Sequence, residues 1–189
     1  MKFTTKIILT SLSFLLTLSC TKDEVAVEAL DLKASISKKN DVKMVPFKGN
    51  LLSTPNGTEQ VVCIPSDANV AVPEINAVEG NATHLGILDR DQSPLFVIDC
   101  NLNFDDPEDP KVITVLDITL RNKNGDGVRL LGQSTISLSG PASGSYEIIE
   151  GFGKFSGATG SANTTGFFNP EVGSASFSVK GMVTQPNRK

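Results

Sequence analysis

The feature that most constrains this chain is a period-two alternation of apolar and polar residues, which begins near Met44 and continues almost to the C-terminus. Successive side chains of a β-strand point to opposite faces, so the pattern predicts half-buried strands and an all-β fold. No amphipathic helix of three turns is expected after Met44. The four clearest apolar rows are Phe96, Ile98, Cys100, Leu102 and Phe104; Val112, Thr114, Leu116, Ile118 and Leu120; Val128, Leu130, Gly132, Ser134, Ile136 and Leu138; and Ala175, Phe177, Val179, Gly181 and Val183.

Turn signals separate these rows. Asn124-Gly125 and Asp126-Gly127 lie between the second and third rows, where they predict a hairpin. The small residues Gly132 and Ser134 predict a bend or a crowded interior in the third row. In all, nine segments are expected to be strands, at 45–52, 60–64, 78–88, 96–104, 112–120, 128–138, 145–150, 162–168 and 174–183.

Nine strands can be arranged in two ways. An open sheet of that size would leave long unpaired edges, and closure into an antiparallel barrel removes them. The segment 45–184 has 140 residues, enough for eight strands of about ten residues and their turns. We therefore expect a single antiparallel eight-stranded barrel at 44–186, with a two-sheet β-sandwich as the alternative that periodicity leaves open.

The first residues predict export. Lys2 and Lys6 precede a short apolar stretch, the arrangement of a secretory signal. This stretch ends in Leu16-Thr17-Leu18-Ser19-Cys20, which resembles a bacterial lipobox. The resemblance implies that residues 1–19 are removed and that Cys20 carries acyl chains, which would anchor the protein to a membrane. Removal of residues 1–19 changes the formal charge from −4 to −6, so lipid and not a basic patch would supply the membrane affinity.

The residues after Cys20 indicate the cellular location of the protein more closely. Thr21-Lys22-Asp23-Glu24 resembles the surface-export signal of Bacteroidota lipoproteins, which implies a lipid-anchored protein of the outer membrane of a Gram-negative bacterium, exposed at the cell surface. Residues 20–43 carry charges of both signs and little periodicity, as a flexible tether does. A short helix over 24–37 is the alternative for this segment.

Composition excludes several function classes. The net negative charge disfavours binding to a phosphate backbone, so no nucleic-acid partner is predicted. A single His, with no Ser or Cys nucleophile motif, supplies no familiar catalytic triad. No cofactor and no metal site are predicted.

One glycine-rich segment carries a resemblance to a known fold. Gly151, Gly153, Phe155, Ala158 and Gly160 match the Gly-x-Gly-x-Phe-x-x-Ala-x-Gly motif of dirigent proteins and of the wider allene-oxide-cyclase-like barrels. The resemblance implies a calycin-like barrel in which this motif follows a strand, forms a tight turn with one short helical turn, and leads into the next strand. Phe155 would then close the barrel end as a core residue. The glycines serve the backbone in such a corner, because they accept positive φ.

Two shorter segments extend the resemblance. Gly80-Asn81-Ala82-Thr83-His84-Leu85-Gly86 and Val45-Pro46-Phe47-Lys48-Gly49 are similar to segments of bacterial lipoproteins and secreted proteins of this barrel type. A barrel hosts unrelated functions, so the fold does not fix the activity. We expect a non-enzymatic protein that binds a small apolar ligand or a protein partner. The alternatives are a cyclase or isomerase of the allene-oxide-cyclase-like group and a structural surface protein without a ligand.

Two candidate sites have simpler structural interpretations. His84 could act as a general base or a ligand, but a hydrogen-bonding imidazole at a strand start is favoured. Asn122, Asn124, Asp126 and Gln133 match a calcium loop in part, yet an Asn stands at the first position and a Gln at the twelfth. A hairpin turn explains the same residues.

The remaining carboxylates are expected to be solvated. Asp105, Asp106, Glu108 and Asp109 form an acidic run between two prolines, typical of an exposed loop. Asp99 and Asp117 lie on mostly polar strand faces. They are surface residues if the apolar rows face inward, and interior acids if the barrel lumen is the polar side.

Cys63 and Cys100 remain once Cys20 is lipidated. The oxidising export route favours a disulfide between them. If two strands separate them in the sheet, their Cα atoms lie more than about 9 Å apart, beyond the ~7 Å reach of a disulfide. The alternative is a pair of free buried thiols, and the sequence leaves both open.

Overall fold

The computed structural model describes residues 43–184, which contain eleven strands, three short 3₁₀-helices and no α-helix. The prediction of an all-β fold is confirmed. The expectations for the signal, Cys20 and the tether lie outside the described residues. The elements are β1 (Met44–Pro55), β2 (Gln60–Val62), η1 (Ser66–Ala68), β3 (Ala71–Pro73), β4 (Ile75–Ala82), β5 (Gly86–Ile87), η2 (Arg90–Gln92), β6 (Pro94–Asn103), β7 (Lys111–Arg121), β8 (Gly127–Ser137), β9 (Pro141–Phe152), η3 (Gly153–Phe155), β10 (Gly160–Asn169) and β11 (Ser174–Thr184).

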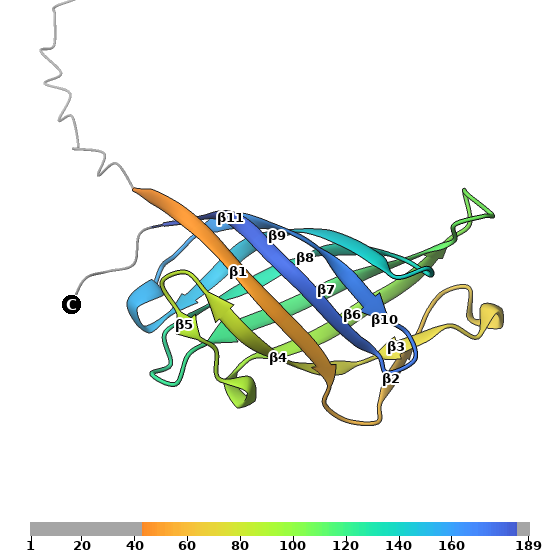
Figure 1. Cartoon of the computed structure of the whole chain (residues 1–189), viewed down its shortest axis with the longest axis horizontal. Coiled ribbons are helices and arrows are strands. Elements are labelled where there is room, and N and C mark those ends of the chain that lie inside the picture. The colour runs from red at the N-terminus through yellow and green to blue at the C-terminus, as the bar shows by residue number, and fades with distance from the viewer. Residues whose placement is uncertain (1–42, 185–189) are drawn as a thin grey trace, which may run out of the picture. The chain divides into compact units, whose positions relative to one another are not determined.

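The large sheet closes on itself (Figure 1). Its strands follow the order β1-β11-β10-β9-β8-β7-β6-β4-β5, and β1 also pairs with β4. The hydrogen bonds therefore form a barrel-like ring of eight antiparallel strands, the arrangement expected in preference to the sandwich. The short β5 adds to β4 outside the ring, and β2 pairs with β3 in a separate two-stranded hairpin.

Two glycines allow the ring to close. β1 pairs with β4 from Gly49↔Ala82 to Pro55↔Asn76. A Cβ at Gly49 would press on the backbone of Asn81, and one at Gly80 would press on the carbonyl of Asn50. Gly80 also has φ 128°, a conformation that L side chains rarely adopt. The segments 45–49 and 80–86 thus meet at the seam of the ring.

Three of the four apolar rows point inward as predicted. Val112, Thr114, Ile118 and Leu120 of β7 are buried, as are Val179 and Val183 of β11. In the row on β8, Val128, Leu130 and Ser134 are buried, while its last member, Leu138, lies beyond the strand and is 46% exposed. The interior of the ring is therefore the apolar side of the sheet.

The row predicted on β6 is wrong in its first half. A register shift between Val97 and Asp99 places a β-bulge at this point, and a bulge reverses the face on which later residues lie. Leu95 and Val97 are buried before the bulge, whereas Phe96 and Ile98 are 40% and 56% exposed. Cys100 is buried after it, in agreement with the prediction, whereas Phe104 at the end of the row lies beyond the strand and is 50% exposed.

The strand expected at 78–88 is interrupted. β4 ends at Ala82, and the turn Thr83–Leu85 carries His84 at φ 67° before the two residues of β5. A residue other than glycine in the left-handed region, as His84 is, does not continue a strand, which explains the break. The hairpin partner β3 was not predicted, because three residues are too few to show a period.

The ring has two distinct ends (Figure 1). β1 begins and β11 finishes at one end, where Met44 pairs with Thr184. The opposite end, called the mouth here, is formed by the segments 55–75, 103–111, 137–141 and 169–174, which connect the strands on that side. The β2–β3 hairpin belongs to the mouth.

Gly80→Ala should destabilise the protein by about 1–3 kcal/mol more than Gly57→Ala, because only the first substitution forces a Cβ against backbone. Gly57 is the matched control: its φ is 140° and nothing lies within 4 Å of an added Cβ. Urea unfolding of the two variants measures the difference. Equal losses would mean that β4 does not approach β1 closely.

Candidate functional site

A small cavity of about 80 Å³ lies inside the ring towards the mouth. Apolar side chains from six of the eight ring strands form most of its wall, among them Leu95, Leu116, Ile136 and Phe177. Seven polar side chains also reach it. They are Ser53, Asn76, Thr114, Ser134, Tyr146, Thr164 and Ser176.

Three of these hydroxyls lie on one rung of the sheet. Thr114 of β7 pairs with Ser134 of β8, Ser134 pairs with Gly144 of β9, and Gly144 pairs with Thr164 of β10. Directly paired residues point to the same face with Cβ atoms about 5 Å apart. The register therefore gathers the hydroxyls of Thr114, Ser134 and Thr164 on one stretch of the inner wall.

Tyr146 completes this hydroxyl row. Its ring lies where side chains at Gly132 and Gly144 would otherwise stand, and its Oη lies next to Gly144. Tyr146 is 5% exposed, and burial raises its pKa. The neighbouring hydroxyls of Ser134 and Thr164 lower that pKa in part, because polar groups near the phenol oxygen favour the phenolate. The hydroxyl row is thus Thr114, Ser134, Thr164 and Tyr146.

One member of the row has no partner. The Ser134 hydroxyl donates to the carbonyl of Ser143 at 3.0 Å. Thr114 is 2% exposed, and its Oγ1 makes no hydrogen bond to any described residue. A buried hydroxyl without a partner costs free energy, so its presence on a cavity wall needs an explanation.

The interior cavity adjoins a larger cleft at the mouth. This cleft has a volume of about 350 Å³ and shares five wall residues with the interior cavity. No charged side chain other than Glu59 and Glu171 lines it, and both belong to connecting segments. The shared residues are Val72, Pro73, Ile136, Phe168 and Gly173.

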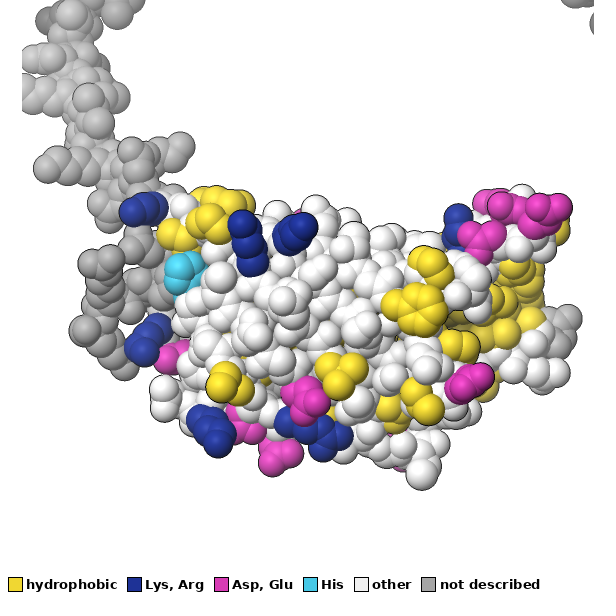
Figure 2. All heavy atoms as spheres, in the orientation of Figure 1, with side chains coloured by type: hydrophobic (Ala, Val, Ile, Leu, Met, Phe, Trp, Pro, Cys, Tyr) yellow, Lys and Arg dark blue, Asp and Glu magenta, His cyan; other side chains and the backbone are white. Residues whose placement is uncertain are grey.

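Exposed apolar side chains surround the mouth. Figure 2 shows hydrophobic side chains gathered at this end, next to an acidic cluster. Six large apolar residues of the mouth are 46–62% exposed, although such residues are usually buried. They form the apolar rim, which consists of Val62, Ile64, Phe104, Leu138, Phe167 and Val172.

The disulfide fixes one wall of the mouth. Cys63 and Cys100 are bonded, with Cα atoms 4.5 Å apart. The assumption that two strands separate them is wrong, because the chain after β2 runs directly beside β6. The Ile64 amide donates to the Cys100 carbonyl at 3.0 Å, and the Leu102 amide donates to the Ile64 carbonyl at 2.7 Å. These contacts hold the β2–β3 hairpin, and with it Val72, over the cavity.

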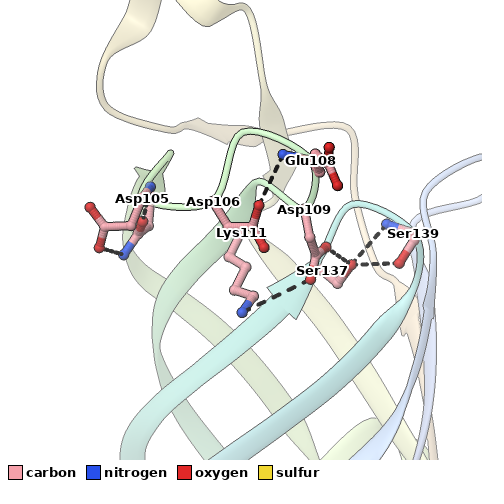
Figure 3. Close-up of polar contacts among 8 residues, drawn as sticks. Asp105, Asp106, Glu108, Asp109, Lys111, Ser137 and Ser139 are labelled. Atoms are coloured by element: carbon pink, nitrogen blue, oxygen red, sulfur yellow. Dashed lines mark hydrogen bonds and ion pairs between the residues drawn. The ribbon is translucent and has the colours of Figure 1, made fainter.

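The acidic run forms a loop at the mouth (Figure 3). Asp109 accepts a hydrogen bond from Ser137 of β8 and lies 3.9 Å from the Lys111 ammonium. Asp106 accepts from the Glu108 amide at 3.0 Å, and Asp105 accepts from the Asn103 side chain at 3.0 Å. The loop is therefore held by its own turns and by the contact of Asp109 with Ser137. Asp105, Asp106 and Glu108 are exposed as predicted, and Asp109 is half-buried.

The other predicted candidates lie away from the cavity. His84 is exposed in the turn after β4, at the end opposite the mouth. Asn122 accepts from the amides of Asn124 and Asp126, the pattern of a hairpin turn. The Asp126 carboxylate accepts a hydrogen bond from the Lys154 backbone amide at 2.9 Å and lies 3.2 Å from the Lys154 ammonium. Gln133 of β8 is exposed and does not join this turn.

Asp99 and Asp117 are outer-face residues. Asp99 is exposed and accepts from the Cys100 amide and the Asn101 side chain. Asp117 accepts two short hydrogen bonds from Arg129, at 2.9 and 2.6 Å, and this raises the pKa of Arg129. Neither carboxylate faces the lumen.

The glycine-rich motif forms the turn between β9 and β10. It contains the one-turn helix η3, and Phe155 is 1% exposed in the core. Gly153 has φ 59°, and a Cβ there would strike Asp126. Ala158 is buried and Gly160 begins β10. Buried side chains of this turn therefore fill the core at the end of the ring opposite the mouth.

Comparison with known proteins adds no identity: no family model matches the chain, and no curated protein or solved structure is significantly similar to it. In the part of the chain that the structure describes, no helix is long and apolar enough to span a membrane. Among the same residues, no group of three His, Cys, Asp or Glu side chains could hold a metal ion.

Tyr146 should titrate above the ordinary tyrosine pKa of about 10, because burial penalises the phenolate. It is the only Tyr in a chain without Trp, so tyrosinate absorbance reports this residue alone. Since the folded pKa is the higher one, the free energy of unfolding should fall as pH rises from about 10 through the folded pKa.

Two controls check this assignment. In urea the titration midpoint should return to the ordinary value, and Thr164→Val should raise the folded midpoint further by removing a group that favours the phenolate. A folded midpoint at or below the ordinary value would contradict the buried position of the phenol.

Proposed function

We propose that this chain is a lipid-anchored binding protein of the bacterial outer membrane, exposed at the cell surface, whose ring takes up a small apolar ligand through the mouth. The observation that carries the proposal is that the mouth cleft adjoins the interior cavity and shares five wall residues with it. Pockets for small ligands measure about 300–1,000 Å³ and are mostly apolar with a few polar groups. The interior cavity alone, at about 80 Å³, is below this range, whereas the cleft reaches it at about 350 Å³.

The anchor half of the proposal rests on Cys20 and the lipobox-like residues before it. The Cys63–Cys100 disulfide supports export, because disulfides persist in oxidising compartments. The chain enters the ring at Met44, at the end away from the mouth. Attachment through the N-terminal segment therefore leaves the mouth free of the chain's point of entry.

The apolar rim supports a second candidate, a protein partner that covers Val62, Ile64, Phe104, Leu138, Phe167 and Val172. A partner of this kind would not need the interior cavity. The cyclase or isomerase alternative would use Tyr146, the one titratable side chain on the wall of that cavity. Recovery of the ligand unchanged from the protein argues for binding, and recovery of an altered product argues for the enzyme.

Cys20→Ser in the full chain should abolish membrane anchoring, because a hydroxyl cannot form the thioether that carries the lipid. Expressed in a Gram-negative host, the parent chain should fractionate with membranes and yield an acylated Cys20 peptide in mass spectrometry. The variant should lack the acyl mass and leave the membrane fraction. An unlipidated Cys20 in the parent chain would overturn the anchor.

Ala142→Leu should block uptake of octane, because Ala142 of β9 lines the interior cavity towards the mouth. The measurement uses the full chain in lipid nanodiscs, with Tyr146 emission as the readout. Ser143→Leu is the control, since Ser143 is the next residue of β9 and points outward. We expect octane to change the emission of the parent and of Ser143→Leu but not of Ala142→Leu. No response in the parent would contradict a ligand inside the ring.

A further inference from the structure

The hydroxyl row places an unused hydrogen-bonding group at the inner part of the proposed ligand path. Thr114 Oγ1 is buried on the cavity wall and makes no hydrogen bond within the described residues. Its neighbours on the rung, Ser134 and Thr164, already contact the Tyr146 phenol. A hydroxyl can donate one hydrogen bond and accept others, so Thr114 fits an oxygen atom of a guest.

The charges around the path select against an anionic guest. No Lys, Arg or His lines the interior cavity or the mouth cleft. Among the described residues that form the mouth, Lys111 is the one base, and it faces Asp109. The acids of the mouth outnumber it: Glu59, Glu74, Asp105, Asp106, Glu108, Asp109 and Glu171. A carboxylate or phosphate would be repelled at the mouth and would lose its hydration inside without a counter-ion.

A cationic inner end is disfavoured for the corresponding reason. The wall of the interior cavity carries no carboxylate, and burial keeps the Tyr146 phenol protonated. An unpaired charge in such a place costs far more than an uncharged polar group that finds a hydrogen bond. The inner end of the guest must therefore be uncharged.

The volume sets the shape of the guest. The interior cavity has room for only several water-sized groups, at about 80 Å³. A branched or polycyclic end does not fit there, whereas an unbranched chain does. The wider cleft, with its apolar lining, takes the remainder of the molecule.

We propose that the ring binds an unbranched apolar molecule whose inner end is an uncharged hydroxyl, hydrogen-bonded to Thr114 within the hydroxyl row. This assignment rests on the proposed function and makes it more specific, because it separates alcohols from both fatty carboxylates and plain hydrocarbons. The guest is a long-chain alcohol by chemical class.

The test compares octanol, octanoate and octane on the full chain in nanodiscs at neutral pH, with Tyr146 emission as the readout. We expect octanol to bind roughly three- to tenfold more tightly than octane, the gain of one net hydrogen bond. Octanoate should bind more weakly than either. Thr114→Val should remove the advantage of octanol and leave octane binding unchanged.

Thr119→Val is the matched control, because Thr119 lies on β7 with the same chemistry but at an outward position of the strand. It should keep the octanol advantage. Thr114→Val should also melt no lower than the parent, since it deletes an unpartnered hydroxyl at nearly constant volume. A lower melting temperature would show that Thr114 already has a partner, and would overturn the assignment.

The outcomes separate the two proposals. If octane and octanol bind equally, or if Thr114→Val leaves octanol binding unchanged, the hydroxyl is satisfied by water and the alcohol assignment is wrong while the proposed uptake of apolar ligands stands. If octanoate binds most tightly, the electrostatic argument is wrong. If none of the three changes Tyr146 emission, the proposed function itself fails.

Discussion

The structure depends on the double pairing of β1, which hydrogen-bonds to β11 along one edge and to β4 along the other. Without the β4 contact the eight strands would form an open sheet with two exposed edges, and exposed edges favour aggregation. The seam is tight because Gly49 and Gly80 leave no room for side chains. The Thr83 hydroxyl adds to it by accepting from the Lys48 amide at 2.9 Å and donating to the Pro46 carbonyl at 3.2 Å.

Because the sheet is closed, the pairing register of its strands brings side chains from several strands together in one interior site. In a closed antiparallel sheet, every residue on a rung that points inward faces the same small interior, so the pairing alone brings Thr114, Ser134 and Thr164 together from three strands. The glycines on β8 and β9 matter for the same reason. Gly132 and Gly144 leave the space that the Tyr146 ring occupies, and the phenol is thereby directed to the hydroxyl row.

The sequence predicted the fold well and the site poorly, for identifiable reasons. Period-two alternation on β7, β8 and β11 is strong because one face is buried along each whole strand. On β6 the bulge near Ile98 inserts a single residue, which alternation cannot reveal. The small residues Gly132 and Ser134 correctly indicated a crowded interior at the site. The side chain that fills this space belongs to Tyr146 on another strand, and only the pairing register shows that it lies beside Gly132. Thr114 is the one polar residue in an otherwise apolar row, and this was the other feature of the sequence that indicated a polar group inside the ring.

The position of the mouth follows from how the two ends of the ring are filled. At the end where β1 starts, the glycine-rich turn inserts Phe155 into the core, and that ring is 1% exposed. At the other end, Phe168 and Phe177 line the cavity without filling it. Its wall is completed by the β2–β3 hairpin, which the Cys63–Cys100 disulfide and the backbone bonds of Ile64 hold against β6. The cavity and the mouth cleft therefore lie towards the end of the ring that is remote from Met44, the residue at which the chain enters it.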